Sequence, residues 1–268
     1  FGQQGSLYIT EVGPIRAAMR LTSRLGASEF VMDVSLTAGA CSIDIQGKLL
    51  WLERQAMAKL AVPLAIDKVT AAWEQAYTVC EKAADGREVP AQCWGDITGQ
   101  MEGVGAYGAA LLNDGRYSYD ALDGEIRLTL ARSAAYADHA GPKHRDSMNE
   151  CMDLGEHRVH MVLVPHVGPW WQAGLDRHAQ ELQTPLFPLG ETYHEGVLPM
   201  KAGFAHVEGE GIRITALKPA EDGRGLIVRC WETRGRDTQG SLVLDFAKTT
   251  IPVSLHPFEI AGFRVKDD

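Results

Sequence analysis

Several absences narrow the functions open to this 268-residue chain. Its five cysteines form no CxxC pair and no tight cluster, which argues against a zinc ribbon and against a disulfide framework. No apolar run approaches the roughly 20 residues that a membrane-spanning helix needs, so we expect no membrane partner. The formal net charge of -9 gives no basic excess of the kind that nucleic-acid binding rewards. The composition suits a neutral ligand such as a sugar.

Familiar catalytic and cofactor motifs are also missing, because no HExxH, GxSxG or Walker sequence occurs. Gly103-Val-Gly105-Ala-Tyr-Gly108 matches GxGxxG, but it precedes a hairpin signal instead of opening a helix, which argues against a nucleotide site. Catalytic zinc usually needs three converging protein ligands. We therefore assign no metal site, with binding through His157, His160 or His166 as the alternative.

Cysteine usage and the first residues give two further expectations. Unpaired thiols are typical of a reducing compartment, so we expect small buried thiols and a cytoplasmic location. The chain opens with Phe1-Gly-Gln-Gln-Gly5, which is neither an initiator methionine nor a signal peptide. We interpret this start as a cut made inside a longer chain.

The dominant pattern is an alternation of apolar and polar residues, which is typical of half-buried antiparallel strands. It recurs in residues 15–21, 30–36, 60–66, 126–130 and 157–164. Asp or Asn followed by Gly supplies the positive φ that hairpin turns need. Such turn signals occur at Asp85-Gly86, Asn113-Asp114-Gly115 and Asp123-Gly124. Many strands joined by short turns predict a sheet packed on a sheet.

One segment carries a helical pattern. It begins at Gly168-Pro169, ends before Pro185 and aligns four apolar residues on one face: Trp171, Leu175, Ala179 and Leu182. This spacing predicts that Trp171 packs in the core. Trp170 lies off that face, so we expect an exposed ring that could stack on a sugar.

A stretch rich in proline and glycine, residues 184–199, predicts a linker. We therefore divide the chain into a large β domain over 1–185, a linker over 186–202 and a small β-sandwich over 203–268. In the small domain, residues 212–217 and 226–232 flank a Glu-Asp-Gly turn and predict a hairpin. Residues 241–246, 249–255 and 259–265 predict further strands.

Seven stretches, in order along nearly the whole chain, resemble elements of family 38 α-mannosidases. The longest runs from Gly105-Ala-Tyr107 through Asn113-Asp114-Gly115-Arg116-Tyr117-Ser-Tyr119-Asp120. The others are Trp51-Leu-Glu-Arg with Lys59, Pro90-Ala-Gln-Cys-Trp94-Gly-Asp96, Leu128-Thr-Leu-Ala-Arg132-Ser133, Asp153-Leu-Gly155-Glu156-His157 with Pro165-His166, Leu217–Glu232, and Leu255–Phe263. Cys93 and Ala131 depart from the family pattern, and both changes are of the kind that a core accepts.

The resemblance implies a mainly β fold: a large antiparallel sandwich of the galactose mutarotase-like type with one edge helix, then a small sandwich. It also implies a retaining glycosidase whose zinc and catalytic carboxylates lie in an amino-terminal α/β barrel. A barrel needs about 200 residues or more, so this chain has no room for one. We expect no catalytic residue, no metal and no cofactor here, and no hydrolysis by the fragment alone.

The implied partners are the barrel itself and, through its active site, an α-mannoside or oligosaccharide; oligomerisation is left open. Residues 138–157 form a polar loop, and in the family a loop near this place reaches the sugar site. We therefore predict that Asp153 and His157, together with Trp170, line the substrate pocket. In the alternative, Asp153 caps a turn and His157 begins a strand that faces solvent.

Three other functions stay open from the residues alone, since fold does not fix function. A stand-alone carbohydrate-binding module would bind sugar without the barrel. A mutarotase-like sugar epimerase would need a histidine acid and a glutamate base on one concave sheet, and we find no such pair. A structural domain without direct ligand contact is the third.

Overall fold

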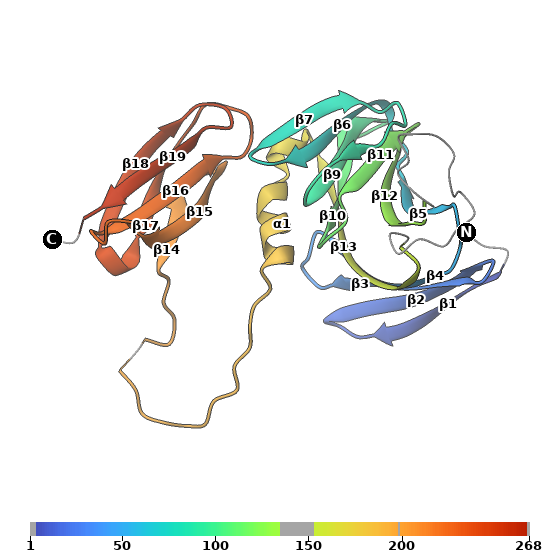
Figure 1. Cartoon of the computed structure of the whole chain (residues 1–268), viewed down its shortest axis with the longest axis horizontal. Coiled ribbons are helices and arrows are strands. Elements are labelled where there is room, and N and C mark those ends of the chain that lie inside the picture. Colours follow the sequence, from blue (N-terminus) through green and yellow to red (C-terminus); the bar gives the residue numbers. More distant parts are fainter. Residues whose placement is uncertain (1–3, 135–152, 198, 267–268) are drawn as a thin grey trace. The chain divides into compact units, whose positions relative to one another are not determined.

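The computed structural model describes residues 4–134, 153–197 and 199–266. These residues form two compact units (Figure 1). The first unit contains the chain up to Gln75 together with Cys80–Gln183, and the second contains Ala76–Val79 and the chain from Thr184 onward. The mainly β fold predicted from the sequence is confirmed, with one α-helix among the described residues.

The first unit is built on a nine-stranded antiparallel sheet with the strand order β1-β2-β3-β4-β13-β10-β9-β6-β7. A four-stranded sheet, β5-β12-β11-β8, packs on one of its faces. The strands are β1 (Gln4–Val12), β2 (Arg16–Leu25), β3 (Ser28–Thr37), β4 (Ile43–Trp51), β5 (Met57–Pro63), β6 (Asp67–Gln75), β7 (Thr78–Ala83), β8 (Val89–Pro90), β9 (Trp94–Met101), β10 (Gly105–Asn113), β11 (Ser118–Leu122), β12 (Glu125–Arg132) and β13 (Gly155–Val167).

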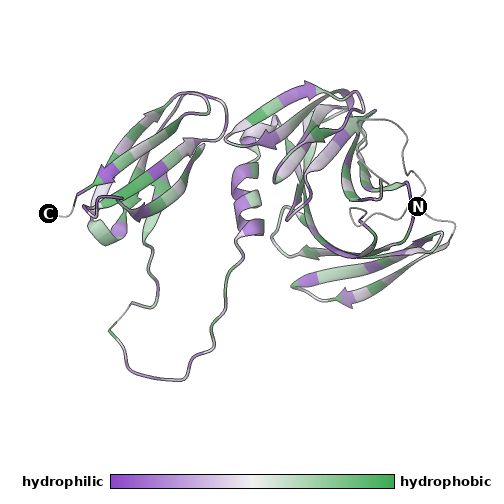
Figure 2. Cartoon of the chain, in the orientation of Figure 1, coloured by the Kyte–Doolittle hydropathy of each residue, from purple (hydrophilic) through white to green (hydrophobic). Residues whose placement is uncertain are grey.

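Alternation along the strands separates an inner face from an outer face. In β4 the side chains of Ile45, Leu49 and Trp51 are buried, whereas Gln46 and Lys48 between them are exposed. Figure 2 shows the same change between hydrophobic and hydrophilic residues along other strands. The inner faces of the two sheets share one core, which includes Trp51, Trp73, Ile97, Leu111, Tyr119, Leu128 and Met161. This burial of apolar surface is the main source of stability for the unit.

The Asn-Asp-Gly segment connects β10 to β11, which belong to different sheets, and it has no residue with a positive φ, so the hairpin turn predicted there was wrong. The hairpin turn predicted at Asp123-Gly124, between β11 and β12, is confirmed. The β10–β11 connection is stabilised by a buried side chain. Asn113 is buried, and its Oδ1 accepts hydrogen bonds from the backbone N–H groups of Gly115 (2.8 Å) and Arg116. Its Nδ2 donates to the Tyr119 hydroxyl at 2.6 Å, and that hydroxyl donates to the Leu111 carbonyl at 3.0 Å. A buried amide needs such partners, so this stretch depends on specific side chains.

The predicted helix is divided in two by a turn. A 3₁₀ segment, η1 (Trp170–Gln172), is followed by Gly174 with φ of +63° and then by α1 (Leu175–Gln183). The left-handed residue interrupts the helical register, so Trp171 does not share one helical face with Leu175 and the apolar residues that follow it. Trp170 is therefore buried and Trp171 is only half-buried. Our expectation that Trp170 is exposed and Trp171 forms the core was wrong.

The second unit is a small sandwich of two three-stranded sheets, β14-β17-β18 and β15-β16-β19. Its elements are β14 (Ala205–Glu208), β15 (Ile212–Pro219), β16 (Leu226–Glu232), β17 (Thr238–Leu244), η2 (Asp245–Ala247), β18 (Thr249–Leu255) and β19 (Ile260–Val265). The predicted β15–β16 hairpin is confirmed. Glu232 is buried, and its carboxylate accepts backbone N–H groups of Arg234, Gly235, Arg236 and Phe258 at 2.7–3.2 Å.

The cysteines differ from the expected buried thiols. Cys230 is buried, but Cys80 and Cys93 are half-buried and Cys41 is exposed, and none of these four described cysteines forms a disulfide. Cys151 lies outside the described residues. No helix in the described ranges has the length and apolar character required to cross a membrane.

Candidate functional site

Asp153 and His157, two of the predicted site residues, are brought together at the start of β13. The Asp153 carboxylate Oδ2 accepts the backbone N–H of Arg132 at 3.0 Å, which ties it to the end of β12. The His157 Nε2 lies 2.8 Å from the Asp153 carbonyl oxygen, so Nε2 carries the proton and donates. Its Nδ1 then accepts from the Arg116 guanidinium at 3.4 Å. Asp153 thus caps a strand end, and a role in a sugar pocket stays a prediction.

Trp170, the third predicted residue, is held inside the first unit. Its indole Nε1 donates to the Glu81 carboxylate at 2.7 Å, and the centroids of the Trp170 and Trp94 rings are 5.6 Å apart. With 9% of its surface exposed, the ring offers no open face for stacking on a sugar. Any contribution to a sugar pocket would have to be indirect, through the position of η1.

A buried acid–imidazole pair links two of the family-like sequence elements. His166 Nε2 lies 2.7 Å from Asp96 Oδ2, and both side chains are almost fully buried. The Thr98 hydroxyl donates to Asp96 Oδ1 at 2.8 Å, and the Gly168 carbonyl lies 3.1 Å from His166 Nδ1. Burial raises the pKa of Asp96, although the hydrogen bond from His166 opposes this. The pair joins β9 to β13, and sequence reasoning missed it.

A second charged group that sequence reasoning missed lies on the four-stranded sheet. The Asp120 carboxylate is fully buried and ion-paired with both Lys59 and Arg127, while Lys59 also contacts Glu88. A buried carboxylate needs such partners to offset its desolvation. Because Asp120 is already bound by two cations, we interpret this group as structural.

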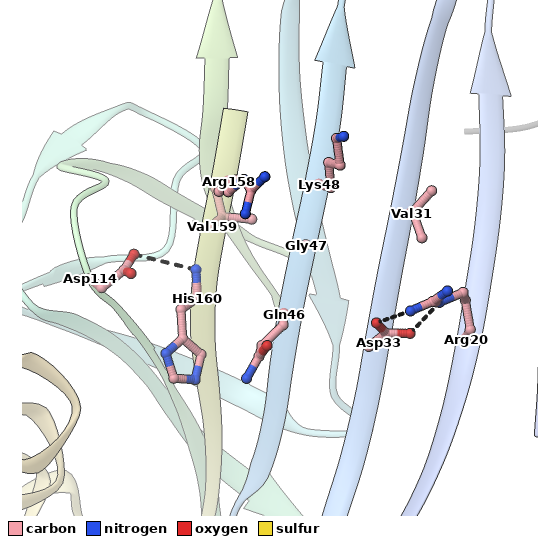
Figure 3. Close-up of a pocket in the computed structure, with 10 residues that line it drawn as sticks. All are labelled: Arg20, Val31, Asp33, Gln46, Gly47, Lys48, Asp114, Arg158, Val159 and His160. Atoms are coloured by element: carbon pink, nitrogen blue, oxygen red, sulfur yellow. Dashed lines mark hydrogen bonds and ion pairs between the residues drawn. The ribbon is translucent and has the colours of Figure 1, made fainter. Parts of the chain in front are cut away.

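A polar cleft on the outer face of the nine-stranded sheet is the strongest candidate site (Figure 3). It encloses about 650 Å³ over strands β2, β3, β4 and β13. Its lining consists of Arg20, Val31, Asp33, Gln46, Gly47, Lys48, Asp114, Arg158, Val159 and His160. None of these positions was singled out as a binding residue from the sequence, apart from His160 as an alternative metal ligand.

The register of the sheet explains why these polar residues meet. Arg20 lies opposite Asp33, Asp33 opposite Gln46, and Gln46 opposite His160, so four neighbouring strands contribute one continuous row. Residues paired across antiparallel strands share a face. Figure 3 shows Asp114 at the His160 end of this row, where its Oδ1 accepts the backbone N–H of His160 at 3.3 Å.

The charges in the cleft are largely paired with one another. Arg20 makes a bidentate ion pair with Asp33, with both N–O distances at 2.6 Å. This hydrogen bonding lowers the pKa of Asp33, so its carboxylate stays ionised at neutral pH. His160 Nε2 lies 2.6 Å from Asp44. Such pairing fixes the side chains without leaving a net field of one sign.

The cleft and its surroundings do not fit a metal ion. Within the described ranges, no three His, Cys, Asp or Glu side chains are grouped so that they could hold one. His157, His160 and His166 lie on the same strand but are engaged with different partners. The described residues therefore do not fit a zinc ion of the kind that the resemblance implies for the amino-terminal barrel.

Comparison with known proteins supports the resemblance seen in the sequence and the β fold seen in the structure. Residues 2–140 match the family model described as "Glycosyl hydrolases family 38 C-terminal domain". Residues 211–251 match "Glycosyl hydrolases family 38 C-terminal beta sandwich domain". Together with the two-unit β fold, these matches define the class as the β region of a glycosidase. The chain belongs to glycosyl hydrolase family 38 and corresponds to its carboxy-terminal region.

The relatives named α-mannosidase are much longer than this chain. Alpha-mannosidase G of Dictyostelium discoideum is 25% identical over 93% of this chain and 22% of its own length. Human alpha-mannosidase 2C1 is 24% identical over 87% of this chain and 22% of its own length. The chain thus spans about a fifth of these relatives. An alpha-mannosidase structure from Enterococcus faecalis V583 has the same fold, with a TM-score of 0.82 at 16% identity, over 98% of this chain and 35% of that one.

Proposed function

We propose that this chain is the carboxy-terminal region of a retaining, zinc-dependent α-mannosidase that hydrolyses terminal α-mannosides, and that alone it is not catalytic. The observation that carries this proposal is the family 38 match over residues 2–140, together with relatives named alpha-mannosidase of which the chain spans only about a fifth. The catalytic machinery then belongs to the amino-terminal part of the longer protein. There one carboxylate acts as nucleophile and another as acid and base.

An exposed apolar surface supports the existence of a large partner. On β1, β2 and β3 the inner-face residues Leu7, Ile9, Met19 and Leu36 are exposed, with 61%, 69%, 41% and 52% of their surfaces open. The register places Leu7 opposite Leu21 and Ile9 opposite Met19, so they continue the core-facing side of the sheet. We call Leu7, Ile9, Met19 and Leu36 the apolar face.

An apolar groove of about 470 Å³ opens beside this face, between β1–β3 and β5. Monomeric proteins in water rarely expose a large contiguous apolar patch, and such a patch usually marks an interaction site. Its occupant is the amino-terminal part of the same protein, because about four fifths of the relatives' length lies outside this chain. In this arrangement the β region forms a wall beside the barrel, and Asp153 and His157 remain its candidate contributors to the sugar pocket.

The test is hydrolysis of p-nitrophenyl α-mannoside with added zinc, measured for this chain and for the longer protein. We expect turnover by the longer protein, loss of turnover after chelation, and no rate above background for the chain alone. Metal-dependent hydrolysis by the chain alone would place the catalytic groups inside it and contradict the proposal. An inert longer protein with zinc present would contradict the assignment as an α-mannosidase.

A further inference from the structure

The polar cleft has the length of a small ligand with several hydrogen-bonding groups. Neighbouring strands are about 4.8 Å apart, so the row from Arg20 across to His160 covers roughly 14 Å. Donors and acceptors alternate along it: the Arg20 guanidinium, the Asp33 carboxylate, the Gln46 amide and the His160 ring. Hydroxyl groups both donate and accept hydrogen bonds, so they suit such a mixed row.

The charge balance of the cleft selects against ions. Lys48 and Arg158 are both paired with Glu156, at 2.8 and 3.4 Å, and Arg20 is paired with Asp33. An anion would have to compete with these carboxylates for each cation. A metal ion would find no group of three ligands among the described residues. A neutral ligand avoids both difficulties, because it needs no counter-charge.

The row is held in place before any ligand arrives. The bidentate Arg20–Asp33 pair and the short His160–Asp44 contact restrict these side chains, which lowers the entropy lost on binding. The backbone of Gly47 lies in the lining between them. At the β1 end, Tyr8 pairs opposite Arg20 with 47% of its surface exposed, so the row continues into an aromatic ring. Aromatic rings with a polar tip suit ligands that are part apolar and part polar.

We propose that this cleft is a binding site for a neutral oligosaccharide, with Arg20, Asp33, Gln46 and His160 as its hydrogen-bonding row and Tyr8 as its aromatic end. The geometry of the row selects a neutral, hydroxyl-rich ligand. The choice of α-linked mannose units rests on the proposed function. The site would hold part of an oligosaccharide chain, and it performs no bond cleavage.

The experiment is a titration of the ¹⁵N-labelled 268-residue chain with an α-linked mannotriose, followed by amide chemical shifts. We expect saturable shifts that cluster on β2, β3, β4, β13 and the Asp114 turn, with a Kd on the order of 1 mM. The double variant Gln46→Ala with Arg158→Ala removes one member of the row and one further exposed side chain of the cleft lining, and it should weaken binding about tenfold. Tyr8→Ala should weaken it several-fold.

The matched control is Arg24→Ala, on the same strand and face as Arg20 but outside the cleft lining. It should bind mannotriose like the unchanged chain. The dispersion of the amide spectrum checks that each variant is folded. No saturable shifts, shifts located away from these strands, or equal weakening by Arg24→Ala would overturn the proposal. The same would follow if inorganic phosphate shifted these amides and the sugar did not.

The hydrolysis assay of the longer protein is run beside this titration, so the two proposals fail separately. Hydrolysis without binding at the cleft would remove the cleft site and keep the α-mannosidase assignment. Saturable binding of neutral sugar by the cleft without hydrolysis by the longer protein would keep the site and remove the assignment. In the latter case a panel of other neutral trisaccharides, titrated in the same way, would identify the preferred sugar.

Discussion

The two halves of the nine-stranded sheet differ sharply in how they are covered. In β10, the consecutive residues Ala109, Ala110, Leu111 and Leu112 have no exposed surface, because the four-stranded sheet covers one face and elements including α1 contact the other. In β1, every side chain described is exposed. Both strands are well formed. The comparison shows that a strand forms once it pairs with a neighbouring strand, whereas its side chains become buried only when a second layer of structure packs on the sheet. For β1–β3 that layer is incomplete among the described residues.

The largest expected effect separates a covered leucine from an uncovered one. Leu111→Ala should lower the free energy of unfolding by about 2–5 kcal/mol, because it leaves a cavity in a close-packed core. Leu7→Ala, the matched change on β1, should lower it by less than about 0.5 kcal/mol in the isolated chain. Urea unfolding followed by tryptophan fluorescence measures both. Similar losses for the two variants would mean that β1 is buried in solution.

The pH dependence of stability should have opposite signs in the two halves. Burial raises the pKa of Asp96 in the covered half, so the folded chain retains its proton more readily than the unfolded chain. Its contribution is therefore present below about pH 4 and is lost as the pH rises through the raised pKa. Arg20 lowers the pKa of Asp33 in the uncovered half. The contribution of Asp33 is present above about pH 4 and is lost as the pH falls through the lowered pKa.

Asp96→Asn and Asp33→Asn test these signs by urea unfolding between pH 3 and pH 8. As the pH rises, the free energy of unfolding of the unchanged chain should fall relative to that of Asp96→Asn. As the pH falls, it should fall relative to that of Asp33→Asn. The Asp33 effect should be the smaller one, because this ion pair is partly exposed to solvent. Slopes of the same sign for both variants would contradict the assigned environments.

The smallest expected effect concerns the apolar face. Ile9→Ser should change the stability of the isolated chain by less than about 0.5 kcal/mol, since the side chain is already largely exposed. In the longer protein the same change should be clearly destabilising, because it would place a hydroxyl in a buried contact. Thr10→Ser, next to it on β1, is the matched control and should be neutral in both proteins. Equal, small effects of Ile9→Ser in both would mean that the apolar face stays open.

Much of the fold could be predicted from local patterns. Alternation predicted the strands over 30–36, 126–130 and 157–164, and the Asp123-Gly124 turn between β11 and β12 followed from residues that tolerate a positive φ. Family-like elements gave the class of protein. The interruption of the helix at Gly174 was not predicted, because the apolar residues keep a helical spacing across this position and a single glycine is also tolerated inside a helix. The exposures expected for Trp170 and Trp171 were wrong for that reason.

The candidate sites could not be predicted, because they depend on pairing between distant strands. His160 and Asp44 are 116 positions apart in the sequence, and their contact exists only because β13 pairs with β4. The buried pair of Asp96 and His166 likewise joins residues 70 positions apart. Nothing local marks these side chains as partners. The one signal available was a charged or imidazole group at an alternating position of an otherwise apolar strand.

Hydrogen exchange of β1–β3 tests most directly the central claim that the uncovered half of the sheet is completed by the rest of the protein. It would be measured by mass spectrometry for the isolated chain and for the longer protein under identical conditions. Peptides from β1 and β2 should exchange much more slowly in the longer protein, whereas peptides from β10 should be protected equally in both. Equal, fast exchange of β1 and β2 in both proteins would contradict the account.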